Sequence, residues 1–254
     1  MPYKIVIDAG HGGEDPGAVY RGRQEKDDNL RLAMAVGQIL ENRGVDVVYT
    51  RTGDVYQTPF EKATIGNEAN ADFFISFHRN SSPRSNQYSG VETLVYDKSG
   101  EKLELAENIN GALGELGYQN LGVKARPGLV VLRRTKMPAV LIETGFINTD
   151  ADNQLFDQKF DQTAQAIADA VLGTLGEEEV EQEPQLYRVQ VGLFRVKQNA
   201  DNLLYELLDK GYPAFMLYED GFYKVQVGAY RVLGNAVKME RQLRQAGYDT
   251  WITT

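Results

Sequence analysis

The stretch KIVIDAGHGG, residues 4–13, joins a short apolar run to a glycine-rich turn that contains a histidine. The run predicts a buried β-strand over residues 4–7, because apolar residues fill it and turn residues end it. The turn is not a phosphate-binding P-loop, since no Gly-Lys-Ser/Thr follows. Its glycines let the backbone bend closely around whatever His11 binds. Because α/β folds build their sites at the carboxyl ends of parallel strands, this stretch predicts such a fold with a site at His11.

Strand-like and helix-like segments alternate along the rest of residues 1–175. Short apolar runs predict further strands over 46–50, 73–77, 91–96, 129–132 and 139–142. Amphipathic stretches predict helices over 29–42, 60–70, 102–116 and 160–175. Strands that alternate with helices predict an α/β fold, in which helices flank a mostly parallel sheet on both faces.

Residues 186–254 contain an internal repeat. The segment YRVQVG at 187–192 returns as YKVQVG at 223–228, and each copy predicts a strand, a helix and a strand. Two copies predict a small α+β, ferredoxin-like domain with the order β-α-β-β-α-β. Alternation along the opening strands places Gln190 and Gln226 on an exposed polar face, opposite the valines. That face is either a solvated surface or a platform for an extended polar ligand such as a glycan.

The segment GEEEVEQEPQ, residues 176–185, is acidic and nearly devoid of apolar residues. Gly176 and Pro184 bracket it, so it is predicted to be a linker between domains of residues 1–175 and 186–254. The alternative is an acidic extension of the helix that precedes it.

Composition limits the classes of function. The chain has 254 residues, of which 42% are hydrophobic and 25% charged, as in soluble globular proteins. Its net charge of -9 argues against duplex nucleic acid as the main partner, since phosphate binding needs a basic surface. No cysteine is present, so any metal must be held by histidine and carboxylate groups. No apolar stretch approaches the ~18 residues of a membrane span, and we expect no signal peptide, since no basic and apolar leader pattern is recognised before the first strand.

Four ionisable side chains are candidates for one site. The only histidines, His11 and His78, each follow an apolar strand-like run; Glu143 follows the run 139–142, and Glu25 precedes a helix. Two imidazoles and a carboxylate would supply three of the four ligands that zinc takes. The alternative is that the histidines are structural hydrogen-bonding residues and that the glutamates cap a helix or a turn. The spacing of the residues leaves both interpretations open.

Four motifs, in this order, resemble those of a known family. They are DAGHGG at 8–13 with DPGA at 15–18, EK at 25–26, SFHRN at 76–80 and MPAVLIETGFIN at 137–148. They are similar to the signatures of zinc-dependent N-acetylmuramoyl-L-alanine amidases of the Amidase_3 family. The chain departs from that pattern at Ala9, where the family usually has proline, and at Arg79, where it has a small residue. The repeats of residues 186–254 resemble the SPOR domain, a peptidoglycan-binding module.

The resemblance implies a site and a mechanism. His11, Glu25 and His78 would bind Zn2+, leaving the fourth position open for water, and Glu143 would act as the general base. Asn80 is expected to contact the substrate. Arg79 is expected to do so as well, and to change the charge and preference of the cleft. Gln190 and Gln226 are expected to bind the glycan.

The resemblance also implies a biological role. The expected partner is peptidoglycan, and the bond cut would join the lactyl group of N-acetylmuramic acid to L-alanine. We expect a monomer, made in the cytoplasm without a signal peptide, that reaches the wall after lysis or holin-type export. Mother-cell lysis in sporulation is the expected context. The alternatives are a phage endolysin of the same activity, a non-catalytic wall-binding protein and a zinc hydrolase of another class.

Overall fold

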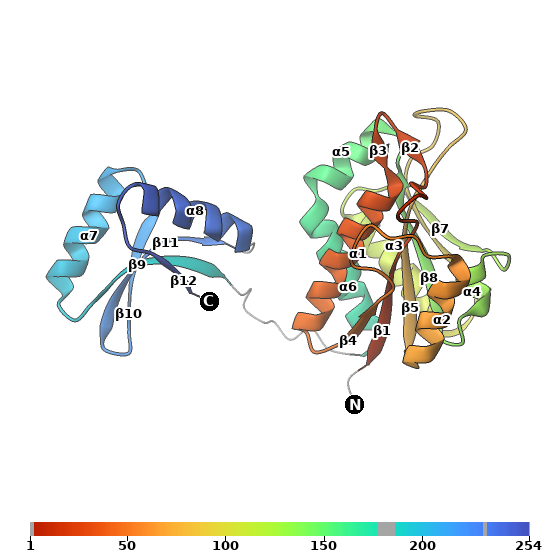
Figure 1. Ribbon diagram of the computed structural model, residues 1–254, viewed down its shortest axis with the longest axis horizontal. Coiled ribbons are helices and arrows are strands. Elements are labelled where there is room, and N and C mark those ends of the chain that lie inside the picture. Colours follow the sequence, from red (N-terminus) through yellow and green to blue (C-terminus); the bar gives the residue numbers. More distant parts are fainter. Residues whose placement is uncertain (1–2, 177–185, 231–232, 254) are drawn as a thin grey trace. The chain divides into compact units, whose positions relative to one another are not determined.

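A computed structural model describes residues 3–176, 186–230 and 233–253 (Figure 1). Contacts divide the chain into two compact units, Met1–Val180 and Glu181–Thr254. Residues 177–185 of the predicted linker lie outside the described residues. Among the described helices, none is both long and apolar enough to cross a bilayer.

The first unit contains a six-stranded sheet in the order β4-β1-β5-β8-β6-β7. Its strands are β1 (Lys4–Ala9), β4 (Asp46–Tyr49), β5 (Phe73–Asn80), β6 (Val91–Val95), β7 (Asn120–Ala125) and β8 (Ala139–Phe146). Its helices are α1 (Glu25–Asn42), α2 (Pro59–Ala69), α3 (Gly100–Glu115), α4 (Val130–Arg134), α5 (Asp150–Gln158) and α6 (Phe160–Thr174). A separate hairpin pairs β2 (Val19–Tyr20) with β3 (Arg23–Gln24).

The sheet is mostly parallel, as predicted. Strands β4, β1, β5 and β8 pair in parallel, whereas β6 runs antiparallel to β8 and parallel to β7. The carboxyl ends of β1, β5 and β8 therefore lie side by side at one edge of the sheet. This edge is where the predicted site residues of these three strands come together.

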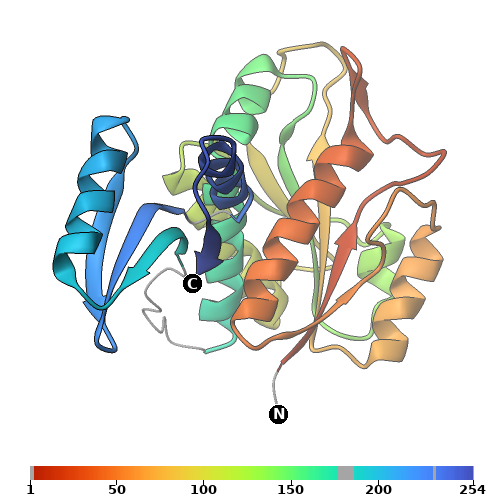
Figure 2. The same cartoon turned by 60° about the vertical axis from the view of Figure 1, so that its left-hand side comes forward.

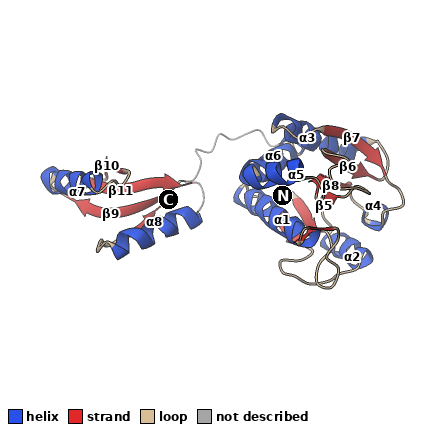
Figure 3. Cartoon of the chain, turned by 90° about the horizontal axis from the view of Figure 1, so that it is seen from above, coloured by secondary structure: helices blue, strands red, loops and turns tan. Residues whose placement is uncertain are grey.

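Helices cover both faces of the sheet. Helices α1, α3 and α6 lie on one face and α2 and α4 on the other, as the view from above shows (Figure 3). Alternation along each strand divides the core accordingly: Ile5 and Ile7 pack under the first set of helices, and Val6 under the second. A capping box of Thr58 and Glu61 begins α2 and satisfies its first backbone N–H groups.

Several elements differ from the prediction, which also lacks the hairpin β2–β3 and the helix α5. The expected strand over 129–132 is wrong: the chain there forms the helix α4, because a run of four apolar residues fits either structure. The edge strand β7, which the prediction missed, lies just before it and is only half-buried, so its apolar pattern is weak. Helix α1 begins at Glu25, earlier than the expected 29.

The second unit has the predicted order β-α-β-β-α-β. Its antiparallel sheet runs β10-β11-β9-β12. The elements are β9 (Tyr187–Phe194), α7 (Lys197–Asp209), β10 (Ala214–Glu219), β11 (Phe222–Tyr230), α8 (Leu233–Gln245) and β12 (Trp251–Thr253). Both helices lie against one face of the sheet (Figure 2), where Val189 and Val225 pack with Leu207 and Leu243.

Candidate metal centre

The structure brings His11, Glu25 and His78 together. His11 lies in the turn after β1, Glu25 begins α1, and His78 lies near the end of β5. Each residue offers one ligand atom, and these atoms lie within 4.8 Å of one another. His11 Nε2 is 3.2 Å and His78 Nδ1 is 2.9 Å from the same oxygen, Glu25 Oε1. The two imidazoles and the carboxylate therefore converge on one point.

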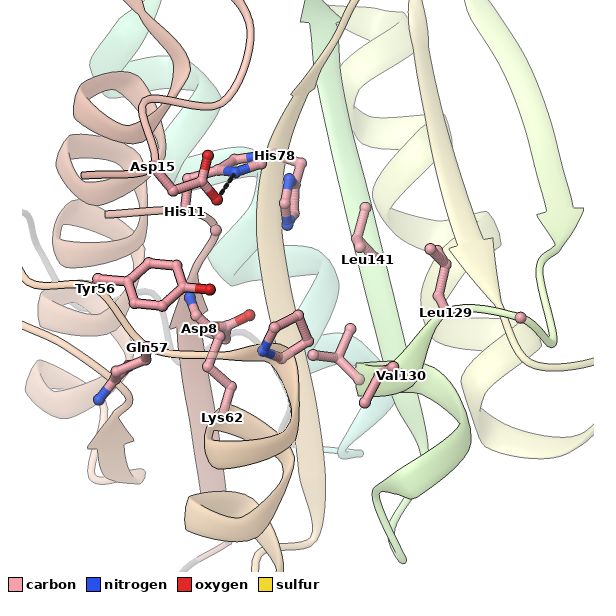
Figure 4. Close-up of a pocket in the computed structure, with 14 residues that line it drawn as sticks. Asp8, His11, Asp15, Tyr56, Gln57, Lys62, His78, Leu129, Val130 and Leu141 are labelled. Atoms are coloured by element: carbon pink, nitrogen blue, oxygen red, sulfur yellow. Dashed lines mark hydrogen bonds and ion pairs between the residues drawn. The ribbon is translucent and has the colours of Figure 1, made fainter. Parts of the chain in front are cut away.

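Neighbouring groups hold the three side chains in place. Asp15 Oδ2 lies 2.8 Å from His11 Nδ1, which leaves Nε2 to face Glu25 (Figure 4). Glu25 accepts hydrogen bonds from the backbone N–H groups of Ala18 and Arg79, at 2.9 and 3.1 Å. A carboxylate behind a ligating imidazole fixes both the tautomer and the orientation of the ring.

Gly10 is required for this close approach. A Cβ at that position would lie 2.3 Å from His78 Nε2. Contacts under 3.0 Å are essentially absent from real side chains, so any larger residue would displace the imidazole. The glycine-rich turn thus lets the backbone of one strand end approach the ligand on the next.

The electrostatics of the cluster favour a bound cation. Burial raises the pKa of Glu25, but the hydrogen bonds and charges of His11 and His78 hold it well below its usual range. Burial lowers the pKa of His11, but its contacts with Glu25 and Asp15 outweigh this effect and raise the pKa to about 9. The site therefore stabilises positive charge beside an ionised carboxylate. Two imidazole nitrogens and one carboxylate oxygen are a donor set that fits Zn2+.

Glu143 lies next to this cluster on β8, where it pairs with His78 across the sheet. Its Oε2 is buried and has no hydrogen-bond partner among the described residues. Burial, together with the negative charges of Glu25 and Glu92, raises the pKa of Glu143 to about 7 against the opposing effect of the two histidines. A carboxyl group with a pKa near neutrality can both accept and return a proton.

A cavity of about 280 Å³ opens beside the cluster. It lies on the α2/α4 face, because three of its lining residues, Asp8, His78 and Leu141, project from the sheet on that side. Figure 4 shows Asp8 and Tyr56 on the β1 side of the cavity, with Leu129, Val130 and Leu141 opposite. The other residues that line it are Gly10, His11, Asp15, Gln57, Pro59, Lys62, Gly128 and Val131.

A buried ion pair fixes α2 beneath the cavity. Lys62 Nζ lies 2.8 Å from Asp8 Oδ1, and both side chains are at least 95% buried. Thr50 and Ser76 also donate hydrogen bonds to the Asp8 carboxylate. Burial raises the pKa of Asp8, but Lys62 and these hydroxyl groups lower it more. The pair therefore carries both charges, and its geometry holds the wall of the cavity in place.

The expectation that Arg79 contacts the substrate and changes the charge of the cleft is wrong. Its side chain is 2% exposed and lies away from the cavity, with Nη1 2.6 Å from Asp28 Oδ2. The guanidinium also stacks 4.3 Å above the Phe156 ring and donates to Asn153. Consecutive strand residues point to opposite faces, so the residue after His78 faces α1 and α5 instead of the substrate. Arg79 therefore binds helices together.

Asn80 lies further along β5, toward β6. Its Nδ2 donates to Glu92 Oε1 at 3.0 Å, and Glu92 in turn lies opposite Glu143 on the neighbouring strand. Lys124 Nζ contacts the other carboxylate oxygen of Glu92. Glu92 thus links Asn80 to the strand position opposite Glu143. The contact of Asn80 with the substrate stays a prediction.

In the second unit, Gln190 and Gln226 were expected to be exposed, but both are buried. Each is 4% exposed, and Gln226 Nε2 donates to Gln190 Oε1 at 3.4 Å. They lie on the two central strands, where longer neighbours such as Arg188 and Lys224 rise around them. Together these residues line a cavity of about 230 Å³ with Leu217, Glu219 and Thr253. The polar face is therefore concave at its centre.

Several residues of the site were not predicted from the sequence. Asp15 lies four residues after His11 in the segment DPGA, and this spacing in a tight turn was the available signal. Tyr56, in the loop before α2, and Val130, at the start of α4, line the cavity from positions far along the chain, and nothing in the local sequence predicted them.

Comparison with known proteins adds independent findings. The family model described as N-acetylmuramoyl-L-alanine amidase, Amidase_3, matches residues 5–173. The SPOR domain model matches residues 183–254.

Individual relatives agree with these matches. The chain is 36% identical over 223 residues to the sporulation-specific N-acetylmuramoyl-L-alanine amidase of Bacillus subtilis, covering 85% of each. It is 38% identical over 153 residues to an endolysin of Bacillus phage SPP1, covering 58% of this chain and 56% of that one. A crystal structure of an N-acetylmuramoyl-L-alanine amidase from Clostridium difficile 630 superposes with a TM-score of 0.66 at 33% identity, covering 70% of this chain and 98% of that chain.

Proposed function

This chain belongs to the N-acetylmuramoyl-L-alanine amidase family, and we propose that His11, Glu25 and His78 hold its zinc ion. The bond cut is the amide between the lactyl group of N-acetylmuramic acid and the L-alanine of a stem peptide. The observation that carries the site assignment is the convergence of three ligand atoms within 4.8 Å, beside Glu143 with its unpartnered oxygen.

The residues divide the chemistry between them. A bound zinc ion supplies Lewis-acid polarisation of the scissile carbonyl and lowers the pKa of the attacking water. Glu143 accepts the proton of that water at Oε2 and returns it to the departing amine. Asp15 keeps the His11 ring in the orientation that presents Nε2 to the site. Asn80, held by Glu92, contacts the substrate beside the base.

The second unit binds the wall. Gln190 and Gln226 lie at the bottom of a polar concavity bordered by Arg188 and Lys224. Amide and cationic side chains in a recess can hydrogen-bond sugar hydroxyl and carbonyl groups. The SPOR unit therefore anchors the enzyme on glycan strands.

The biological setting is mother-cell lysis during sporulation. This setting is favoured because the similarity to the sporulation-specific relative extends through both units, whereas the similarity to the phage endolysin covers little more than half of the chain. The same enzymatic activity would serve either setting.

Zinc content tests the site. The purified protein should carry one zinc ion per chain, and His78→Ala should lose it. Glu143→Gln should keep zinc but lose activity on peptidoglycan. A fully active protein after complete chelation, or a His78→Ala variant that retains zinc at wild-type affinity, would refute the assignment.

A further inference from the structure

One segment of this acidic chain is strongly basic. Residues 121–138 carry Lys124, Arg126, Arg133, Arg134 and Lys136 and no aspartate or glutamate. Lys124 is partly exposed and the other four are exposed. Among the described residues, only Lys124 has a carboxylate within 4.0 Å, that of Glu92. Within residues 3–176, 186–230 and 233–253, the other four cations have no carboxylate partner, and their exposure lets them meet charges on a ligand.

This basic segment borders the site on one side. It includes Leu129 and Val130, which line the same cavity as the two histidines. Its first cation, Lys124, contacts Glu92, and Glu92 lies directly opposite Glu143 on the neighbouring strand. The cations therefore begin close to the general base and continue along β7 and α4.

The opposite side of the site is acidic. The turn that carries His11 also carries Glu14 and Asp15, and Asp54 packs on that turn through the Gly13 N–H. The lysine nearest to them, Lys26, is already paired with Asp54 at 2.7 Å. The exposed ring of Tyr56 completes this side and lines the cavity (Figure 4). The exposed charges therefore differ in sign between the two sides of the cavity, with carboxylates on the His11 turn and cations on the basic segment.

The substrate of the proposed function has two arms of unlike charge. The glycan arm consists of N-acetylated sugars without net charge, whereas the stem-peptide arm carries carboxylates. We infer that the peptide arm lies over the basic segment, where Arg126 and Arg133 attract its carboxylates, and that the glycan arm lies toward Tyr56 and the His11 turn. The reverse orientation would place carboxylates against Glu14 and Asp15. This inference rests on the proposed amidase function and adds the direction in which the substrate binds.

A matched pair of substrates tests this orientation. The substrates are N-acetylmuramoyl-L-alanyl-D-glutamate and its diamide, which differ only in charge. The wild-type protein should prefer the dianion about three- to ten-fold in kcat/KM, chiefly through KM, as one or two exposed ion pairs allow. High salt should shrink this preference, because it screens exposed charges. The double variant Arg126→Glu, Arg133→Glu should abolish or invert the preference.

The control is a double variant with the same change in net charge on the other side of the sheet. Lys4 begins β1 and Arg43 lies just before β4, so both lie at the amino end of β1, far along the strand order from β7. Lys4→Glu, Arg43→Glu should keep the preference. The inference is overturned if the control loses the preference equally, if the test variant retains it, or if the wild-type cleaves both substrates equally.

Two further outcomes distinguish this inference from the proposed amidase function and from binding of wall phosphates. A wild-type protein that cleaves neither substrate, but carries zinc, contradicts the proposed function itself. If the test variant keeps the substrate preference and loses binding only to walls that carry phosphate polymers, the cations bind wall phosphates and the inference fails.

Discussion

Replacing Glu143 with glutamine should stabilise the metal-free protein while it abolishes catalysis. Glutamine has nearly the same shape as glutamate but no charge, so the substitution isolates the cost of burying the carboxylate. Glu143 Oε2 is enclosed without a hydrogen-bond partner among the described residues, and burial raises the pKa to about 7. We therefore expect the buried Glu143 carboxylate to lower the free energy of unfolding of the metal-free protein.

The magnitude follows from the pKa. Below about pH 4.5 the carboxyl group is protonated in both the folded and the unfolded protein, and burial costs no ionisation. As the pH rises to about 7, the unfolded chain loses this proton while the folded chain retains it, so stability falls. Above pH 7 the loss is constant, at roughly 3 kcal/mol for a pKa that moves from 4.5 to about 7. Glu143→Gln should recover this amount at about pH 8 and almost none at about pH 4.

The assay is urea unfolding of the metal-free wild-type and variant proteins at these two pH values. Far-ultraviolet circular dichroism should follow the transition, because the single tryptophan, Trp251, belongs to the second unit and does not report on the catalytic one. At each pH, the free energy of unfolding of the wild type is subtracted from that of the variant. The two differences, at about pH 4 and about pH 8, are then compared. In parallel, activity of the zinc-loaded variant should fall by about 10²–10⁴.

Two results would refute this reasoning. If the stability difference between variant and wild type is the same at both pH values, Glu143 is not a buried carboxyl with a raised pKa. If the zinc-loaded variant retains near-normal activity, Glu143 is not the general base.

Further substitutions test the support around the site. Asp15→Asn should lower zinc affinity about 10- to 100-fold with little effect on the fold, measured by competition with a chelator, and an unchanged affinity would exclude its orienting role. Lys62→Met should destabilise the first unit by about 3–5 kcal/mol in urea unfolding, because it leaves the Asp8 carboxylate buried and unpaired; a loss below about 1 kcal/mol would contradict the ion pair. Gly10→Ala should displace His78 and abolish zinc binding, and a variant with full zinc occupancy would show that the turn can relax.

Much of the fold could be predicted from local pattern. The runs that precede His11 and His78 in β1 and β5 are mostly apolar, as expected for a sheet buried on both faces. The segments around 120–134 were harder, because β7 is a half-buried edge strand and α4 is a single short helical stretch. There the tertiary packing of α4 against α2 decides the structure, and the local sequence does not reveal it.

The site residues show the same division. Glu25, His11 and His78 converge because the ends of β1 and β5 and the start of α1 meet at one edge of the sheet, which strand order alone can imply. Arg79 directly follows His78 on β5, so alternation along the strand already predicted that its side chain lies on the opposite face of the sheet from the site. The burial of Gln190 and Gln226 depends on the neighbouring strand, so it could not be predicted from one strand's alternation.

The most direct test of the account is mass spectrometry of peptidoglycan digested by the zinc-loaded protein. The digest should contain free stem peptides that begin with an L-alanine amino group, and glycan strands whose lactyl groups end in newly formed carboxylates. New reducing sugar ends, released acetate or cuts within the stem peptide would instead show a hydrolase of another class and contradict the central claim.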